Sequence, residues 1–223
     1  MNDVQNKRPL PLPLPVVPMG SQDDGLLKTS DLAHPVAVQV EVWAAAEPKY
    51  YFQLMLNGEL VGDIREITES DKPGDVITVY LSEQLLTQNG SYQLGYMASS
   101  PFSESHVPSS QIPLRVDRTP AGAALLAPLI VPNATFGNHL TALLPGYAGM
   151  EPGDTIQTLC NGQPGPTHIV QPDELTLRPI EIVFEREVMQ SLAADNVAIS
   201  YTVTDRAGNL SIESLPVTLS LNM

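Results

Sequence analysis

The residues that could carry chemistry in this 223-residue chain are few and far apart. Its one cysteine, Cys160, cannot form an internal disulfide or a cysteine-based zinc site. No histidine has the spacing of a His-x-His or His-Glu-x-x-His metal site; the four are His34, His106, His139 and His168. The sequence contains no nucleophile elbow, phosphate-binding loop or dinucleotide-binding fingerprint. We therefore predict that the chain is not an enzyme.

The charge balance excludes one large class of partner. The chain has 25 Asp and Glu against 11 Lys and Arg, for a formal net charge of −14. Because phosphate backbones are bound by clustered Lys and Arg, nucleic acid is not expected as a main partner. The chain is 43% hydrophobic, which argues against wholesale disorder.

No targeting or membrane-spanning segment is expected from the sequence. The basic pair Lys7-Arg8 is followed by alternating prolines and not by an apolar helix, so no signal peptide is predicted. The longest apolar stretch, residues 121–131, contains Pro128 and is about half the length of a membrane span. The expectation is a protein that is cytosolic or exported by a signal-independent route.

The body of the chain contains two copies of one unit. Asn57-Gly58 and Asn161-Gly162 lie 104 residues apart, and Tyr96 and Tyr201 lie 105 apart. Apolar positions match at a spacing of 104 in the first part of the unit and, after a gain of one residue, at 105 in the rest, so a chance match is improbable. In this alignment Cys160 corresponds to Leu56, which predicts that Cys160 is a buried strand residue.

Period-two alternation predicts short strands in both copies. Val36, Val38 and Val40 alternate with polar or small residues, as in a half-buried strand. The run 76–81 is apolar on both faces, so its orientation depends on the alignment with 180–185. At a spacing of 104, that alignment predicts that Val76 and Tyr80 face the core. Tyr50 and Tyr51 are adjacent and must face opposite sides, so one of them is expected to be exposed.

About seven short strands per 100 residues, separated by turn signals such as Asn-Gly, are typical of an immunoglobulin-like antiparallel sandwich. The predicted fold class is all-β, with two such sandwiches in tandem after a Pro-rich extended arm. The predicted boundaries are residues 1–29 for the arm and linker, 30–118 for the first domain and 119–223 for the second.

Two segments resemble bacterial immunoglobulin-like repeats of surface and adhesin-type proteins. They are the strand and turn 201–209, Tyr-Thr-Val-Thr-Asp-Arg-Ala-Gly-Asn, and the linker 116–120, Val-Asp-Arg-Thr-Pro. Residues 147–154 resemble another such repeat, from multidomain proteins of pseudomonad-type bacteria. The first domain departs from the pattern, because Ser100-Pro101-Phe102-Ser103-Glu104 replaces the Asp-x-Ala-Gly-Asn turn.

This resemblance implies one candidate ion. Related adhesin repeats hold calcium at domain junctions, and calcium prefers several carboxylate and carbonyl oxygens. The matching positions here are Asp117 at the junction and Asp205 and Asn209 in the loop of the second domain. The alternative is that Asp205 and Asn209 only build a turn. No other cofactor is expected.

The N-terminal run 9–18, Pro-Leu-Pro-Leu-Pro-Leu-Pro-Val-Val-Pro, must be extended, because proline fixes φ and removes N–H donors. Leu10, Leu12 and Leu14 then point one way and could line a sheet edge in this or a neighbouring molecule. These three residues form a candidate interaction arm that would also pair two copies of the chain. The alternative is a leader without a binding role.

The predicted function is a non-enzymatic bacterial tandem immunoglobulin-like module, binding or structural, associated with the surface or with secretion. It would contact a protein or a carbohydrate through loops or sheet edges. An alternative is a secreted toxin or effector component that acts on host or competitor cells. A third hypothesis is an accessory domain of an enzyme, which would bind an oligosaccharide.

Overall fold

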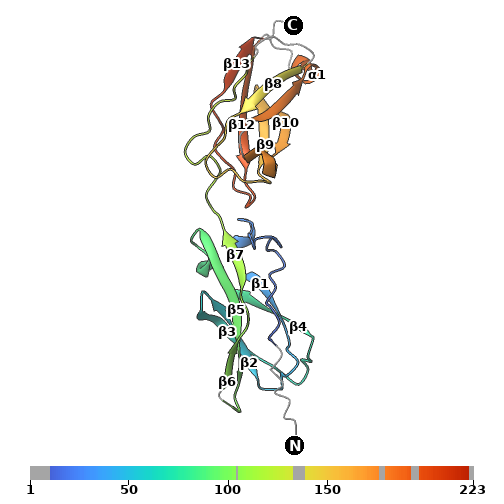
Figure 1. Cartoon of the computed structure of the whole chain (residues 1–223), viewed down its shortest axis with the longest axis vertical. Coiled ribbons are helices and arrows are strands. Elements are labelled where there is room, and N and C mark those ends of the chain that lie inside the picture. The colour runs from blue at the N-terminus through green and yellow to red at the C-terminus, as the bar shows by residue number, and fades with distance from the viewer. Residues whose placement is uncertain (1–10, 104, 133–138, 176–178, 192–195, 221–223) are drawn as a thin grey trace, which may run out of the picture. The chain divides into compact units, whose positions relative to one another are not determined.

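The structure is a computed structural model of the chain, and it describes residues 11–103, 105–132, 139–175, 179–191 and 196–220. The chain divides into two compact units, Met1–Asp117 and Arg118–Met223. We call them the first and the second sandwich. Both consist of antiparallel strands (Figure 1). No helix among the described residues is long and apolar enough to cross a membrane.

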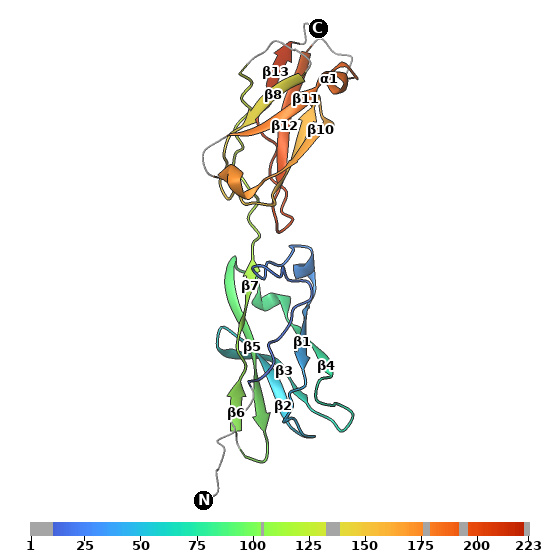
Figure 2. The ribbon, with the colours of Figure 1, turned by 45° about the vertical axis from the view of Figure 1, so that its right-hand side comes forward.

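The first sandwich contains a small and a large sheet. The small sheet pairs β1 (Val36–Glu41) with β4 (Val76–Leu81). The large sheet has the order β3-β2-β5-β6, and its strands are β2 (Tyr51–Leu56), β3 (Glu59–Glu66), β5 (Gly90–Ser100) and β6 (Ser105–Pro108). A further strand, β7 (Ile112–Val116), also pairs with β5. Because β6 pairs with the end of β5 and β7 with its beginning, the two lie at opposite ends of β5 (Figure 2).

The second sandwich repeats this plan. Its small sheet pairs β8 (His139–Leu144) with β11 (Ile180–Glu185). Its large sheet has the order β10-β9-β12-β13, with β9 (Thr155–Cys160), β10 (Gln163–Ile169), β12 (Asn196–Thr204) and β13 (Val217–Ser220). One short helix, α1 (Arg186–Ser191), follows β11. Two antiparallel sheets around one core in each unit confirm the predicted immunoglobulin-like fold class.

Alternation along the strands determines which residues form each core. On β1, Val36, Val38 and Val40 are at most 1% exposed, whereas Gln39 between them is half-buried. Cys160 on β9 is 1% exposed, as its alignment with Leu56 predicted. Burying these side chains stabilises each sandwich by roughly 25 cal/mol for each Å² of apolar surface removed from water.

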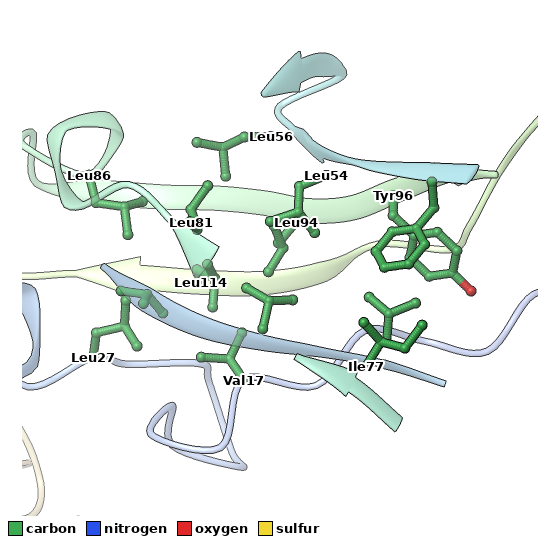
Figure 3. Close-up of a cluster of buried hydrophobic side chains, with 14 of the residues drawn as sticks. Val17, Leu27, Leu54, Leu56, Ile77, Leu81, Leu86, Leu94, Tyr96 and Leu114 are labelled. Atoms are coloured by element: carbon green, nitrogen blue, oxygen red, sulfur yellow. The ribbon is translucent and has the colours of Figure 1, made fainter. Parts of the chain in front are cut away.

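The predicted orientation of β4 is wrong. Ile77 and Leu81 point into the core of the first sandwich (Figure 3), whereas Val76 and Tyr80 are 58% and 64% exposed. The pairings Val38↔Val79 and Ala142↔Ile182 occupy the same place in the two small sheets. The two strands therefore correspond at a spacing of 103 residues and not 104. A slip of one residue moves every side chain of a strand to the other face.

The turns after β2 and β9 are each stabilised by an asparagine at the equivalent position. Asn57 and Asn161 both have positive φ, 52° and 50°, and each precedes a glycine. The side-chain oxygen of Asn57 accepts a hydrogen bond from the Gln93 N–H (2.8 Å), and that of Asn161 accepts one from Ala198 (2.9 Å). The Asn-Gly signal in the sequence thus both turns the chain and ties it to the neighbouring strand.

A tyrosine on β5 and its counterpart on β12 make the same two contacts. The Tyr96 hydroxyl donates to the Pro13 carbonyl (2.9 Å), and that of Tyr201 donates to the Ala127 carbonyl (2.8 Å). Both tyrosine N–H groups donate to a serine Oγ at 3.0 Å, Ser109 in the first case and Ser214 in the second. Residues 11–17 of the first sandwich are therefore the structural equivalent of residues 125–131 of the second.

Replacing Ser109 or Ser214 by alanine is expected to destabilise the affected sandwich by about 1–3 kcal/mol, because a buried N–H loses its acceptor. Both serines are buried, at 7% and 4% exposed, so water does not replace the hydroxyl. Thermal unfolding of the full chain measures the effect. The exposed neighbour Ser110 is the control, and Ser110→Ala should change little; equal effects at positions 109 and 110 would contradict the argument.

The segment before β1 packs on the first sandwich. Val16 and Gln39 exchange two backbone hydrogen bonds of 2.8 Å, at the edge of the β1–β4 sheet. Val17, Leu26 and Leu27 are buried in the core, and Leu12 packs against it. Leu14 is 51% exposed, and Leu10 lies outside the described residues. The pairing of two copies through this segment stays a prediction.

Candidate functional site

The connection that follows β5 differs in its tip from the one that follows β12. In the first, the β5–β6 hairpin extends beyond the sheet, with Pro101, Phe102 and Ser103 at its tip. In the second, a tight turn occupies this place: the Asn209 N–H and side-chain amide donate to the two Asp205 carboxylate oxygens at 2.8 and 2.9 Å. The segments from Tyr96 to Ser109 and from Tyr201 to Ser214 span the same number of residues, so the two connections differ in sequence and not in length.

The predicted calcium ligands have other partners. Both carboxylate oxygens of Asp205 accept hydrogen bonds from Asn209, which is the turn-building alternative. Asp117 belongs to the first sandwich and lies 3.8 Å from the Arg115 guanidinium. Within the described ranges, no three His, Cys, Asp or Glu residues form a group that could hold a metal ion. The calcium site stays a prediction.

A cavity of about 230 Å³ lies beside the β5–β6 hairpin, and we call it the hairpin pocket. Its apolar lining consists of Leu12, Trp43, Ala45, Tyr50, Ala98 and Val107. Its polar lining consists of the serines at positions 99, 100, 103 and 105. Four separate segments contribute: the N-terminal segment, the loop after β1, the start of β2, and the hairpin.

Aromatic rings form one side of the hairpin pocket. The rings of Tyr50 and Phe102 lie 6.1 Å apart between centroids, and those of Trp43 and Tyr96 lie 6.5 Å apart. Trp43 is only 8% exposed and packs against the buried ring of Tyr96. Phe102 is 67% exposed at the hairpin tip. An exposed ring next to an apolar cavity is the kind of surface that binding partners cover.

The equivalent residues of the second sandwich are joined by polar contacts. Tyr147 aligns with Trp43, and its hydroxyl donates to the carboxylate of Asp154, the counterpart of Tyr50, at 3.0 Å. The Glu151 N–H donates to the same Asp154 oxygen at 3.0 Å. Arg206, from the turn after β12, lies over Gly153 and pairs with Glu151 at 3.6 Å. Polar contacts thus hold Tyr147 and Asp154 together, whereas their counterparts Trp43 and Tyr50 line the hairpin pocket.

A second hollow lies on the outer face of the large sheet of the first sandwich. It has a volume of about 410 Å³ and is lined by Tyr51, Gln53, Leu60, Ile64, Met97, Ser99 and His106. Tyr50 and Tyr51 thus line cavities on opposite faces, as their adjacency predicted. Leu60 and Ile64 are more than half exposed, at 51% and 61%.

The remaining candidate residues have structural partners. His106 Nδ1 is hydrogen-bonded to Ser99 Oγ at 2.8 Å, and His168 Nε2 to the Glu174 carboxylate at 2.9 Å. Partial burial would raise the pKa of Glu174, but hydrogen bonds from His168 and the Gln171 N–H hold that pKa below its usual value. Burial raises the pKa of the Cys160 thiol, which opposes the reactive thiolate form.

The sequence pointed to only some of these residues. Residues 100–104 depart from the repeat pattern, but no site was predicted there, and Tyr50 and Tyr51 are both half-buried. Leu12 was a candidate interaction residue, but its place beside Trp43 and Tyr50 was not foreseen, because it depends on where the N-terminal segment packs. The contact between Tyr147 and Asp154 was also missed, although both align with aromatic residues of the first sandwich.

No family model and no curated protein matches the sequence. Among solved structures, the chain is similar to one from a 1.5-MDa bacterial ice-binding adhesin, reported for host cell surface retention, with a TM-score of 0.48 and 16% identity. That match covers 90% of this chain and 61% of the adhesin structure. The chain is also similar to fibronectin(III)-like modules of Clostridium thermocellum CbhA, with a TM-score of 0.43, 12% identity and 93% of each chain covered. The fold assignment rests on the strand order and register described above.

Proposed function

We propose that the chain is a non-enzymatic tandem immunoglobulin-like module that binds a protein or carbohydrate partner through the β5–β6 hairpin and the hairpin pocket. One observation carries the proposal: Trp43 and Tyr50 line the hairpin pocket, whereas their counterparts in the second sandwich, Tyr147 and Asp154, are joined to each other by a hydrogen bond.

The surface around the hairpin pocket has the composition of a contact site. Phe102 and Val107 are 67% and 48% exposed; the Phe102 ring packs against Tyr50, and Val107 lines the pocket together with Trp43. Aromatic residues near a desolvated pocket contribute a large share of binding energy in protein complexes. The chemical groups that line the pocket are aromatic rings, aliphatic side chains and hydroxyls, which suits binding through contact.

The proposal is tested by comparing the wild-type chain with Phe102→Ser. Both are applied to peptide and glycan arrays, and the affinity of any bound probe is then measured by calorimetry. Because Phe102 is exposed, its replacement should leave the fold intact and weaken binding about tenfold or more, the effect of losing roughly 1.4 kcal/mol.

Ile212→Ser provides the matched control. Ile212 is an exposed apolar residue of the second sandwich, 49% accessible, and lies outside the proposed site. This variant should bind like the wild type. Equal binding by Phe102→Ser and the wild type, or equal weakening by both substitutions, would refute the proposed site.

A further inference from the structure

We infer that the hairpin pocket receives one uncharged, ring-sized apolar side chain of a protein partner. This inference rests on the proposed function and narrows it, since that proposal allows either a protein or a carbohydrate. Three properties of the pocket support the narrower assignment: its volume, the charge of its lining, and the state of its hydroxyl groups.

The volume fits a single side chain. An apolar protein cavity of about 150 Å³ holds benzene. Pockets for drug-sized molecules begin at about 300 Å³. The hairpin pocket, at about 230 Å³, lies between these values. It can therefore enclose one aromatic ring or branched aliphatic group, and a larger ligand would have to extend over its rim.

The charge of the lining favours a neutral group. The chain has a formal net charge of −14, yet none of the described residues that line the hairpin pocket carries a charge. An ionised group that entered the pocket would lose hydration without gaining an opposite charge, which is strongly unfavourable. A neutral apolar group loses no such hydration and gains contact with Trp43, Tyr50 and Val107.

The hydroxyl groups favour an apolar side chain over a sugar. The Ser99 hydroxyl is hydrogen-bonded to His106 at 2.8 Å, and Ser100 Oγ accepts from the Phe102 N–H at 3.2 Å. The Ser99 and Ser100 hydroxyls thus each have one protein partner, and the described lining contains no side-chain amide, carboxylate or guanidinium. A buried sugar ring would leave several of its own hydroxyls unpaired, at a cost of about 1–3 kcal/mol each.

The rim explains why the side chain would come from a protein. Phe102 and Val107 extend the apolar surface beyond the pocket mouth, and both are largely exposed. A free small molecule would fill the pocket and leave this rim in water. A protein surface that inserts one side chain also covers the rim, and it excludes water around the inserted group. Volume, charge and rim together point to an anchor side chain.

The test uses the single tryptophan of the chain. Trp43 lines the pocket, and as the only tryptophan it gives one indole N–H signal in the ¹H–¹⁵N NMR spectrum. Titrating the full-length chain with toluene, the side-chain analogue of phenylalanine, should shift this signal in a saturable manner. Benzoate and benzylammonium, which carry the same ring with a charge of either sign, should shift it at least about tenfold more weakly.

Two leucine substitutions, at Ala45 and at Ala44, separate binding in the pocket from binding elsewhere. Ala45 is exposed and lines the pocket, whereas its exposed neighbour Ala44 does not line it. Ala45→Leu should fill the pocket mouth and abolish the saturable shift, and Ala44→Leu should keep it. Because neither side chain is in the core, both variants should fold.

The outcomes distinguish this inference from the proposed function. If toluene causes no saturable shift, or if Ala45→Leu and Ala44→Leu behave alike, the inference is overturned. If methyl glucoside or methyl galactoside shifts the Trp43 signal and toluene does not, the inference is overturned, while the proposed function survives with a carbohydrate partner. The Phe102→Ser comparison decides the proposed function independently of these titrations.

Discussion

Deletion of residues 1–17 is expected to destabilise the first sandwich strongly and to leave the stability of the second unchanged. The deletion removes both hydrogen bonds between Val16 and Gln39, and it removes the Pro13 carbonyl that accepts from Tyr96. It also removes the side chain of Val17, which is 8% exposed in the core. Each of these contacts holds the edge of the β1–β4 sheet or the ring of Tyr96 in place.

The expected loss is large relative to the stability of a small domain. Exposing the core around Val17 costs about 1.5–3 kcal/mol. The unpaired Tyr96 hydroxyl costs about 1–3 kcal/mol, and the two backbone hydrogen bonds contribute about 0.5–1.5 kcal/mol each. The sum, at least about 3.5 kcal/mol, is a major fraction of the 5–15 kcal/mol typical of a small domain.

Trp43 fluorescence measures this effect for the first sandwich alone, because the chain has no other tryptophan. The deletion should shift the denaturation midpoint of the fluorescence signal strongly, while the remaining far-ultraviolet circular dichroism transition stays in place. Deletion of residues 1–10 is the control, since it keeps Pro13, Val16 and Val17. A fluorescence midpoint that is the same for both deletions would contradict the structural role of residues 11–17.

The strands were predictable where one face is apolar and the other polar. On β1, the valines alternate with Ala37 and Gln39, so the period alone identifies the buried face. On β4, both faces are apolar, and the sequence contains no local signal for orientation. The prediction of which β4 face is buried then depended on the alignment with β11. An error of one residue in that alignment assigned the wrong face to the core. Pairing of Val79 with Val38 across the sheet determines the orientation, and this contact joins residues far apart in the sequence.

The N-terminal segment shows a second limit of local reasoning. Alternating prolines predict an extended conformation for residues 9–18, because proline restricts φ whatever its surroundings. They contain no information about the surface on which the segment packs. That surface depends on Tyr96, whose hydroxyl contacts the Pro13 carbonyl 83 residues away in the sequence. The hairpin pocket needs this same packing, since Leu12 forms part of its wall.

The end of the second sandwich that corresponds to the hairpin pocket of the first contains a buried carboxyl group. The sequence did not single out this group. Asp154 has no exposed surface. One of its oxygens accepts hydrogen bonds from the Tyr147 hydroxyl and the Glu151 N–H, and the other has no partner among the described residues. Burial raises the pKa of Asp154; the two hydrogen bonds oppose this effect, and the nearby Asp205 and Glu151 carboxylates add to it.

Replacing Asp154 by asparagine is expected to change how the stability of the second sandwich depends on pH. Because the pKa of Asp154 is raised on folding, its contribution to stability is fully present below the ordinary value of 3.8. That contribution is lost as the pH rises through the folded-state pKa. An asparagine does not ionise, so burying it costs the same at every pH, and its side-chain oxygen can still accept hydrogen bonds from Tyr147 and Glu151. The stability of Asp154→Asn relative to the wild type should therefore increase between pH 4 and pH 7.

Asp154→Ala separates the hydrogen bonds from the charge. At pH 4 this variant should be less stable than the wild type by about 2–4 kcal/mol, because two donors lose their acceptor. The difference should shrink at pH 7, where the wild type also carries the buried charge. Unfolding is followed in the full chain by circular dichroism, and the transition that Trp43 fluorescence does not report belongs to the second sandwich.

Asp71 provides a control of opposite sign in the first sandwich. It accepts hydrogen bonds from the Thr68 N–H and hydroxyl at 2.7 Å and from Arg65 at 3.1 Å. The contacts with Thr68 and then Arg65 lower the pKa of Asp71, so its contribution is present above 3.8 and lost as the pH falls through the folded-state value. Asp71→Asn should therefore lose stability relative to the wild type as the pH rises, whereas Asp154→Asn should gain it. Parallel pH profiles for Asp154→Asn and the wild type would show that the Asp154 carboxyl ionises in the folded chain as freely as in water, despite its burial.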